Sequence, residues 1–171
     1  MRMPVAGRLL VLVSAISGGV ALRAQALPAP TGPSRPSGDG TLNDESLHQM
    51  LVGMGYEPGK LSKGFLLTLK RESWTYYVQL VLSPDGTKLG LNANLGVVPQ
   101  PEAIPAATWR KLLEDNIDVD PSSFNFDPKL KKVFLHRVLD NRSLTASTLR
   151  IQIDRFCDNI HDTADDWKFV H

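Results

Sequence analysis

The chain has 171 residues, of which 42% are hydrophobic and 22% charged, with a formal net charge of +1 at pH 7. This length suggests one domain plus an additional segment at an end. The balanced charge argues against a nucleic-acid-binding protein, because non-specific binding depends on many Lys and Arg contacts to phosphates. The single cysteine, Cys157, cannot form an internal disulfide, and we interpret it as buried and inert.

The first 26 residues have the pattern of a secretory signal peptide. Arg2 and Arg8 give a basic start, residues 9–22 are mostly apolar, and the sequence AQA at residues 24–26 suits a signal peptidase. An apolar run of about 14 residues is too short to span a bilayer, which takes roughly 20. We therefore predict cleavage after Ala26 and a periplasmic or secreted protein without a membrane span. The alternative is a retained N-terminal anchor.

Residues 27–41, LPAPTGPSRPSGDGT, contain four Pro and three Gly. This composition predicts a disordered linker. Cleavage would leave 16 of the 19 basic residues against 18 acidic ones, a formal net charge of −2. The folded domain is expected to occupy residues 42–171.

The domain is predicted to begin with a helix over Asp44–Met54, capped by Asn43 or Asp44 and ended by Gly55. Three strands with alternating apolar residues follow. Because their links are short, they should form an antiparallel meander. Their expected ranges are Phe65–Arg71, Trp74–Leu82 and Thr87–Leu95.

A second helix is expected to start at Pro105 and to bury Trp109, Leu112, Leu113 and Ile117. Two short strands, Phe124–Phe126 and Lys132–Val138, come next. A long last helix should begin within residues 141–143 and reach Trp167, since apolar residues recur at helical spacing. The predicted fold class is therefore α+β, with an antiparallel five-stranded sheet, three helices and the order α-β-β-β-α-β-β-α.

The candidate chemical sites are weak. Counted from Asp118, the segment at residues 116–128 matches part of the EF-hand calcium-binding loop. Ser123 stands where that loop requires Gly, and Lys129 stands where it requires Glu, so we interpret the segment as a helix-to-strand connection.

A row of acidic residues near the C-terminus is close enough to Arg150 and Arg155 to form ion pairs with them. We interpret this row as a solvated helix side, with a metal site as the alternative. Cys157 and His161 share a helix face, but a thiol in an apolar stripe is a poor nucleophile. The acidic row consists of Asp154, Asp158, Asp162 and Asp165.

Two surfaces are candidates for protein binding. Alternation in the second strand points Tyr77, Gln79 and Val81 away from the core, and a partly apolar exposed face often marks a partner site. The alternative is that the long last helix covers this face. The apolar stripe of the last helix is the second candidate, because a helix longer than its sheet needs another partner at its end. Its members are Ile153, Phe156, Ile160 and Trp167.

A glycosylation sequon at residues 141–143 would matter only in a eukaryotic host.

The order of elements and four stretches of sequence resemble the YbjN family, which is similar in fold to type III secretion chaperones. The stretches are LHQMLVGMGY, VLSPDGTKLGLNANLG, WRKLLEDNIDVDPSSFNFDP and LKKVFLHRVLDNRSLTASTLRIQIDRF, and the resemblance covers residues 43–170. It implies an antiparallel sheet packed on helices, frequent homodimers and a binding role without catalytic residues. The export signal departs from those typically cytosolic relatives.

The sequence therefore predicts an exported, non-enzymatic, chaperone-like module that binds a polypeptide segment or pairs as a homodimer, with no cofactor. One alternative is a structural envelope protein without a ligand. Another, less favoured, is an enzyme or metal-dependent site on the C-terminal helix, built on Asp158, His161, Asp162 and Asp165.

Overall fold

The structure, a computed structural model, describes residues 40–170. The predicted signal peptide and most of the predicted linker lie outside the described residues. Gly40 and Thr41, the last two residues of that linker, are attached to the domain. The backbone N–H of Ser143 donates to the carbonyl of Gly40 at 3.0 Å, and Thr41 forms an isolated bridge with Arg142. The described chain thus begins two residues before the predicted start of the domain.

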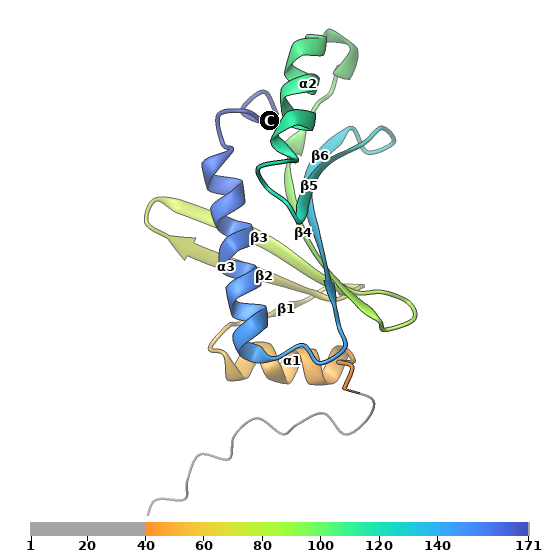
Figure 1. Ribbon diagram of the computed structural model, residues 1–171, viewed down its shortest axis with the longest axis vertical. Coiled ribbons are helices and arrows are strands. Elements are labelled where there is room, and N and C mark those ends of the chain that lie inside the picture. Colours follow the sequence, from red (N-terminus) through yellow and green to blue (C-terminus); the bar gives the residue numbers. More distant parts are fainter. Residues whose placement is uncertain (1–39, 171) are drawn as a thin grey trace, which may run out of the picture. The chain divides into compact units, whose positions relative to one another are not determined.

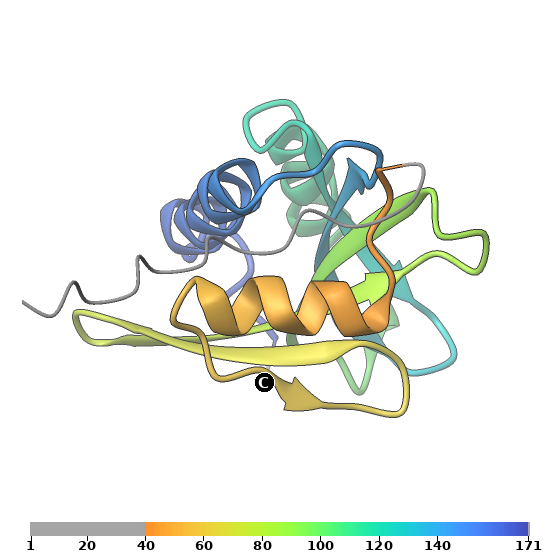
Figure 2. The same cartoon turned by 90° about the horizontal axis from the view of Figure 1, so that it is seen from below.

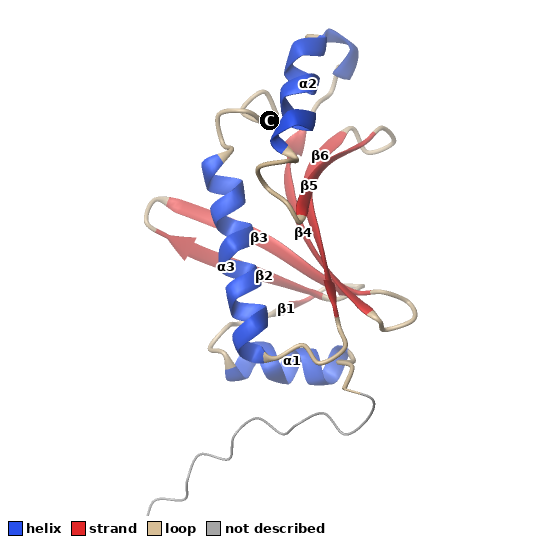
Figure 3. Ribbon diagram, viewed as in Figure 1, coloured by secondary structure: helices blue, strands red, loops and turns tan. Residues whose placement is uncertain are grey.

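The described residues form an α+β fold with one antiparallel sheet, in the strand order β1-β2-β3-β4-β6-β5 (Figure 1, Figure 3). The sheet has six strands rather than the predicted five. The additional strand, β1, is only two residues long and has no apolar alternation. The elements are α1 (Asp44–Gly53), β1 (Gly59–Lys60), β2 (Phe65–Arg71), β3 (Trp74–Leu82), β4 (Lys88–Val97), a 3-10 turn (Pro101–Ala103), α2 (Ala106–Asp115), β5 (Ser122–Asp127), β6 (Lys132–Asp140) and α3 (Ala146–Asp162).

The sheet is strongly twisted. Strands β2 and β3 run across α3, whereas β4, β5 and β6 turn toward α2 (Figure 1). The register of β4 on β6 shifts between Asn94 and Gly96, and such bulges increase local twist. Strand β3 pairs with β4 only from Gln79 to Leu82, so the β2–β3 hairpin projects past α3 at its Glu72-Ser73 turn (Figure 1).

Helices α1 and α3 cover the same face of the sheet (Figure 2). The side chains that alternate inward from β2 and β3 meet those of the two helices in one apolar core. Complete burial of each Leu, Ile or Phe side chain stabilises the fold by about 1.5–3 kcal/mol. From α3, the buried residues are Leu149, Ile153, Phe156, Cys157 and Ile160.

Helix α3 is shorter than predicted at both ends. It starts at Ala146 because the Thr145 side chain accepts the backbone N–H of Thr148 at 3.1 Å, which caps the first turn. It ends at Asp162, and the hydroxyl of Thr163 donates to the carbonyl of Asn159. The predicted extension to Trp167 is therefore wrong, although Trp167 still packs against the core from the turns that follow.

The predicted buried side of the second helix is only half correct. Leu112 is buried and Trp109 packs against the core, but Leu113 and Ile117 are 67% and 80% exposed. Helix α2 ends at Asp115, so Ile117 lies beyond its last turn. Leu113 follows Leu112 directly and therefore points about 100° away from the buried side.

Candidate functional site

The sheet face opposite the helices carries Tyr77, Gln79 and Val81, as the alternation of β3 predicts. Tyr77 is 58% exposed, and the other two side chains are half-buried. Gln79 faces Asn92 of β4, and Asn92 Oδ1 lies 2.5 Å from Nδ1 of His136 on β6. The centre of this face is therefore polar.

The second predicted surface is not accessible. Ile153 and Phe156 are completely buried, and Ile160 is 5% exposed. Trp167 is half-buried, with its ring edge-on to Trp74 at a centroid distance of 6.4 Å. The stripe faces the protein's own sheet, so a partner cannot reach it without opening the core, and the expectation of a free binding stripe on α3 is corrected.

A different feature, which the sequence did not indicate, is the edge of β2. Strand β1 pairs with β2 only at Phe65 and Leu66, and β3 pairs along the other side of β2. Within residues 40–170, the rest of β2, from Leu67 to Arg71, has no neighbouring strand on its outer side. Main-chain groups at an unpaired strand edge can pair with another extended chain, and Thr68 and Lys70 of this stretch are exposed.

A hollow of about 200 Å³ lies beside this edge. Its walls come from the loop after α1 and from the middle of β2, so it combines main-chain groups with apolar and polar side chains. Arg150 of α3 helps to hold the loop in place, since its guanidinium donates to the Met54 carbonyl and lies 5.2 Å from the centre of the Tyr56 ring. The lining residues are Gly55, Tyr56, Glu57, Leu67, Thr68 and Leu69.

The opposite edge of the sheet is protected. The backbone N–H of Phe124 in β5 donates to Oδ1 of Asn116 at 2.6 Å, so a side chain occupies one outward group of this edge. Helix α2 also contacts β5. Residues 116–128 thus connect a helix to a strand, in agreement with our interpretation of that segment.

The acidic row on α3 is partly neutralised from the sheet. Arg71 of β2 forms ion pairs with Asp154 and with Asp158, the latter at 3.1 Å. The predicted pairing of these carboxylates with Arg150 and Arg155 does not appear among the ion pairs of the described chain. Nor does any group of three or more His, Cys, Asp or Glu side chains in residues 40–170 have the arrangement of a metal site.

Cys157 and His161 do not act together. Cys157 is completely buried, and burial raises the pKa of its thiol to about 11, so the nucleophilic thiolate is scarce. His161 is exposed, and its ring lies edge-on to Trp74, with the ring centroids 5.0 Å apart.

Across residues 40–170, no helix has the length and apolar character needed to cross a membrane.

No protein-family model matches the sequence, and no curated protein matches it. The fold is similar to a chain in the ExsC–ExsE complex, with a TM-score of 0.52 and 17% identity over 70% of this chain and 92% of that one. It is also similar to a chain in the heterodimeric ExoU–SpcU complex from the type III secretion system of Pseudomonas aeruginosa, with a TM-score of 0.51 and 15% identity over 76% and 98% of the two chains. The E. coli YbjN structure matches with a TM-score of 0.47 and 13% identity, over 70% and 86%.

Proposed function

We propose that this protein is an exported, non-enzymatic, chaperone-like module that binds an extended polypeptide segment at the edge of β2. The observation that carries the proposal is the two-residue pairing of β1, which leaves Leu67–Arg71 open beside a hollow of about 200 Å³. An added strand would gain main-chain hydrogen bonds from β2, and its alternate side chains would enter the hollow.

The contrast between the two edges of the sheet supports this proposal. An unpaired edge invites aggregation, and proteins usually protect it. Asn116 and α2 protect β5, whereas β2 is covered at only one end. An edge left open beside a lined hollow is the arrangement that a strand-binding site requires.

The similar structures add support at the level of fold. The ExsC–ExsE and ExoU–SpcU structures are both complexes of two proteins, so this fold is compatible with holding a different polypeptide. Together with the resemblance to the YbjN family, this favours a binding module over a structural envelope protein without a ligand.

Export is the second part of the proposal and rests on the signal-like residues 1–26. Expression of the full chain in a bacterium, followed by N-terminal sequencing of the periplasmic or secreted product, tests it. A mature product that begins at Leu27 supports export with cleavage, and an intact cytosolic chain contradicts it.

The binding site is tested by selecting peptides against the protein from a random display library and measuring their affinity by calorimetry. Glu57 is exposed and lines the hollow, so Glu57→Trp should fill the site without disturbing the core. We expect this change to weaken the selected peptides at least tenfold. Glu102→Trp, which places the same ring on an exposed residue of the 3-10 turn, is the matched control and should have no effect.

Two results would contradict the proposed site. Equal affinity of the wild-type protein and the Glu57→Trp variant would place the selected peptides elsewhere. A selection that yields no binding peptide would favour the structural protein without a ligand.

A further inference from the structure

A second hollow, of about 290 Å³, lies where the projecting β2–β3 hairpin meets the last turns of α3. It combines two aromatic side chains with three carboxylates, a composition not found in the hollow beside the β2 edge. Its lining residues are Arg71, Glu72, Trp74, Tyr76, Asp158, His161 and Asp162.

The charge of this hollow is negative. Its one cation, Arg71, is already engaged by Asp154 and Asp158. Glu72 and Asp162 are exposed, and neither has an ion-pair partner within residues 40–170. A cation that entered the hollow would therefore meet carboxylates that are not yet neutralised.

The aromatic wall is held in place. The rings of Trp74 and Tyr76 stack with centroids 6.0 Å apart and an interplanar angle of 19°. His161 and Trp167 contact Trp74 edge-on, at 5.0 Å and 6.4 Å. Indole faces attract cations through the ring quadrupole, most strongly of all the aromatic side chains. A fixed indole beside unneutralised carboxylates is suited to a guanidinium or ammonium group.

The two hollows are adjacent along β2. Leu69 lines the hollow at the strand edge, and Arg71, two residues later, lines the hollow at the hairpin. At a rise of about 3.3 Å per residue, these positions are roughly 7 Å apart along the strand. A segment that follows the β2 edge would therefore bring a side chain close to the second hollow.

We propose that this second hollow binds a basic side chain, arginine or lysine, of the polypeptide segment held at β2. The proposal deepens the proposed function and rests on it. The bound segment should accordingly carry a basic residue near the position that faces the end of β2.

The test uses the purified protein with ¹⁵N-labelled tryptophan, so that the indole N–H signal of Trp74 is followed by NMR. The first probe is N-acetyl-arginine amide, and N-acetyl-citrulline amide is its neutral counterpart of the same shape. At matched ionic strength, millimolar concentrations of the arginine probe should shift the Trp74 signal until the shift saturates. The citrulline probe should cause no such shift. Glu72→Gln combined with Asp162→Asn should weaken the arginine response at least fivefold.

Asp165→Asn is the matched control, because it removes a carboxylate from the same terminal segment but outside the hollow. Equal responses to arginine and citrulline, no saturable shift, or an equal loss in the Asp165 variant would overturn the basic-side-chain site. This probe is too small to form a strand, so its failure leaves peptide binding at the β2 edge untouched.

A second probe asks whether the bound cation belongs to a polypeptide. A blocked five-residue peptide of β-branched residues around one arginine should bind more tightly than the blocked single arginine, because it also pairs with β2. Equal affinity of the two probes would instead identify a site for free small cations and overturn the polypeptide part of the proposal.

Discussion

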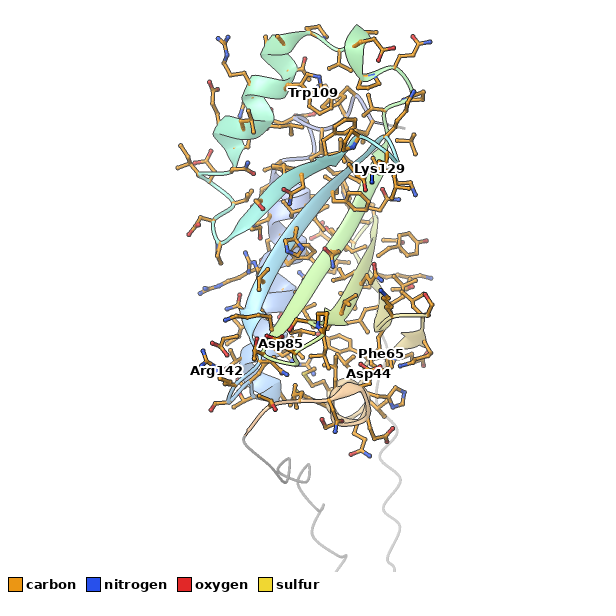
Figure 4. All side chains as sticks on the ribbon, turned by 90° about the vertical axis from the view of Figure 1, so that its right-hand side faces the viewer. Asp44, Phe65, Asp85, Trp109, Lys129 and Arg142 are labelled. Atoms are coloured by element: carbon orange, nitrogen blue, oxygen red, sulfur yellow. The ribbon has the colours of Figure 1, made fainter. Side chains whose placement is uncertain are left out.

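At the scale of single residues, Asn141 connects its own segment to two distant parts of the chain. Its side-chain amide donates to the carbonyls of Leu42 and Gly86 at 2.7 Å each, and its backbone N–H donates to Thr87. Arg142, the next residue, and Asp85 of the β3–β4 turn are both at the end of the sheet that lies toward α1 (Figure 4). Since Asn141 is completely buried, the sequon is closed to modification in the folded protein.

Asn141→Ala should destabilise the protein by about 2–4 kcal/mol, because it leaves the buried carbonyl of Leu42 and the partly buried carbonyl of Gly86 without this donor. The free energy of unfolding in urea is the measurement. Asn125→Ala, an exposed change in β5, is the control and should stay within about 0.5 kcal/mol of the wild type. An equal, small effect of both changes would contradict the role of Asn141.

Cys157 should resist alkylation by iodoacetamide at pH 8 until the protein unfolds, because it is buried and its thiol pKa is raised to about 11. The unfolded chain loses this proton near the ordinary pKa of 9.0, and the folded chain only near 11. The thiol therefore costs no stability below pH 9, and the free energy of unfolding falls as pH rises from 9 toward 11. The alkylation rate by mass spectrometry, with the urea-unfolded chain as reference, checks this. Rapid labelling of the native protein would contradict the burial.

At the scale of elements, α3 is a core helix and not a free binding surface. Ile153→Asp should unfold the protein, since it places an unpaired charge at a completely buried position. Ile151→Asp makes the same change at a residue of α3 that is 48% exposed and should retain the fold. Circular dichroism and thermal unfolding distinguish the two variants. A folded Ile153→Asp protein would show that the stripe does not support the core.

The sequence predicted those elements whose signals are local. The ends of β2 and β3 match the predicted ranges to the residue. Apolar residues alternate along both strands, and the turns at Glu72-Ser73 and Ser83 mark where the strands end. Helix α1 was predicted to within one residue, and Asn43 caps it as expected. The end of α3 was missed because Trp167 is apolar at helical spacing but packs on the core from a turn.

Features that depend on distant contacts could not be predicted. Arg137 is 2% exposed on the core side of β6, where it donates to the hydroxyl of Ser122 and to Gln152. Periodicity places Arg137 inward but cannot supply these partners. Likewise, the edge of β2 is open because β1 pairs with only two of its residues. The length of this pairing depends on contacts between segments and cannot be predicted from either segment alone. The edge of β2 was therefore found in the fold, whereas the surfaces indicated by the sequence were the outer face near Tyr77 and the last helix.

At the scale of the whole molecule, a homodimer must use a surface other than the stripe of α3. Leu113 and Ile117 are the two most exposed large apolar side chains in the described chain, and they are four residues apart. Large apolar side chains that are this exposed are candidates for contact with a partner. We expect the protein to dimerise through them and Leu113→Glu to give a folded monomer.

Light scattering over a concentration series measures the effect. Leu130→Glu, a matched change at a residue that is 57% exposed in the β5–β6 turn, should leave the dimer intact. A wild-type protein that is monomeric at every concentration, or one that both variants dissociate equally, would contradict this pairing.

The central claim is that the edge of β2 holds an extended polypeptide, and hydrogen exchange of individual backbone amides tests it most directly. Exchange rates for residues 65–71 and 122–127 are compared by NMR with and without a selected peptide. An added strand should slow the outward-facing amides of Leu67–Arg71 at least tenfold and leave those of β5 unchanged, because β5 lies at the other edge of the sheet, where Phe124 already donates to Asn116. Unchanged β2 rates with the peptide bound would contradict the account.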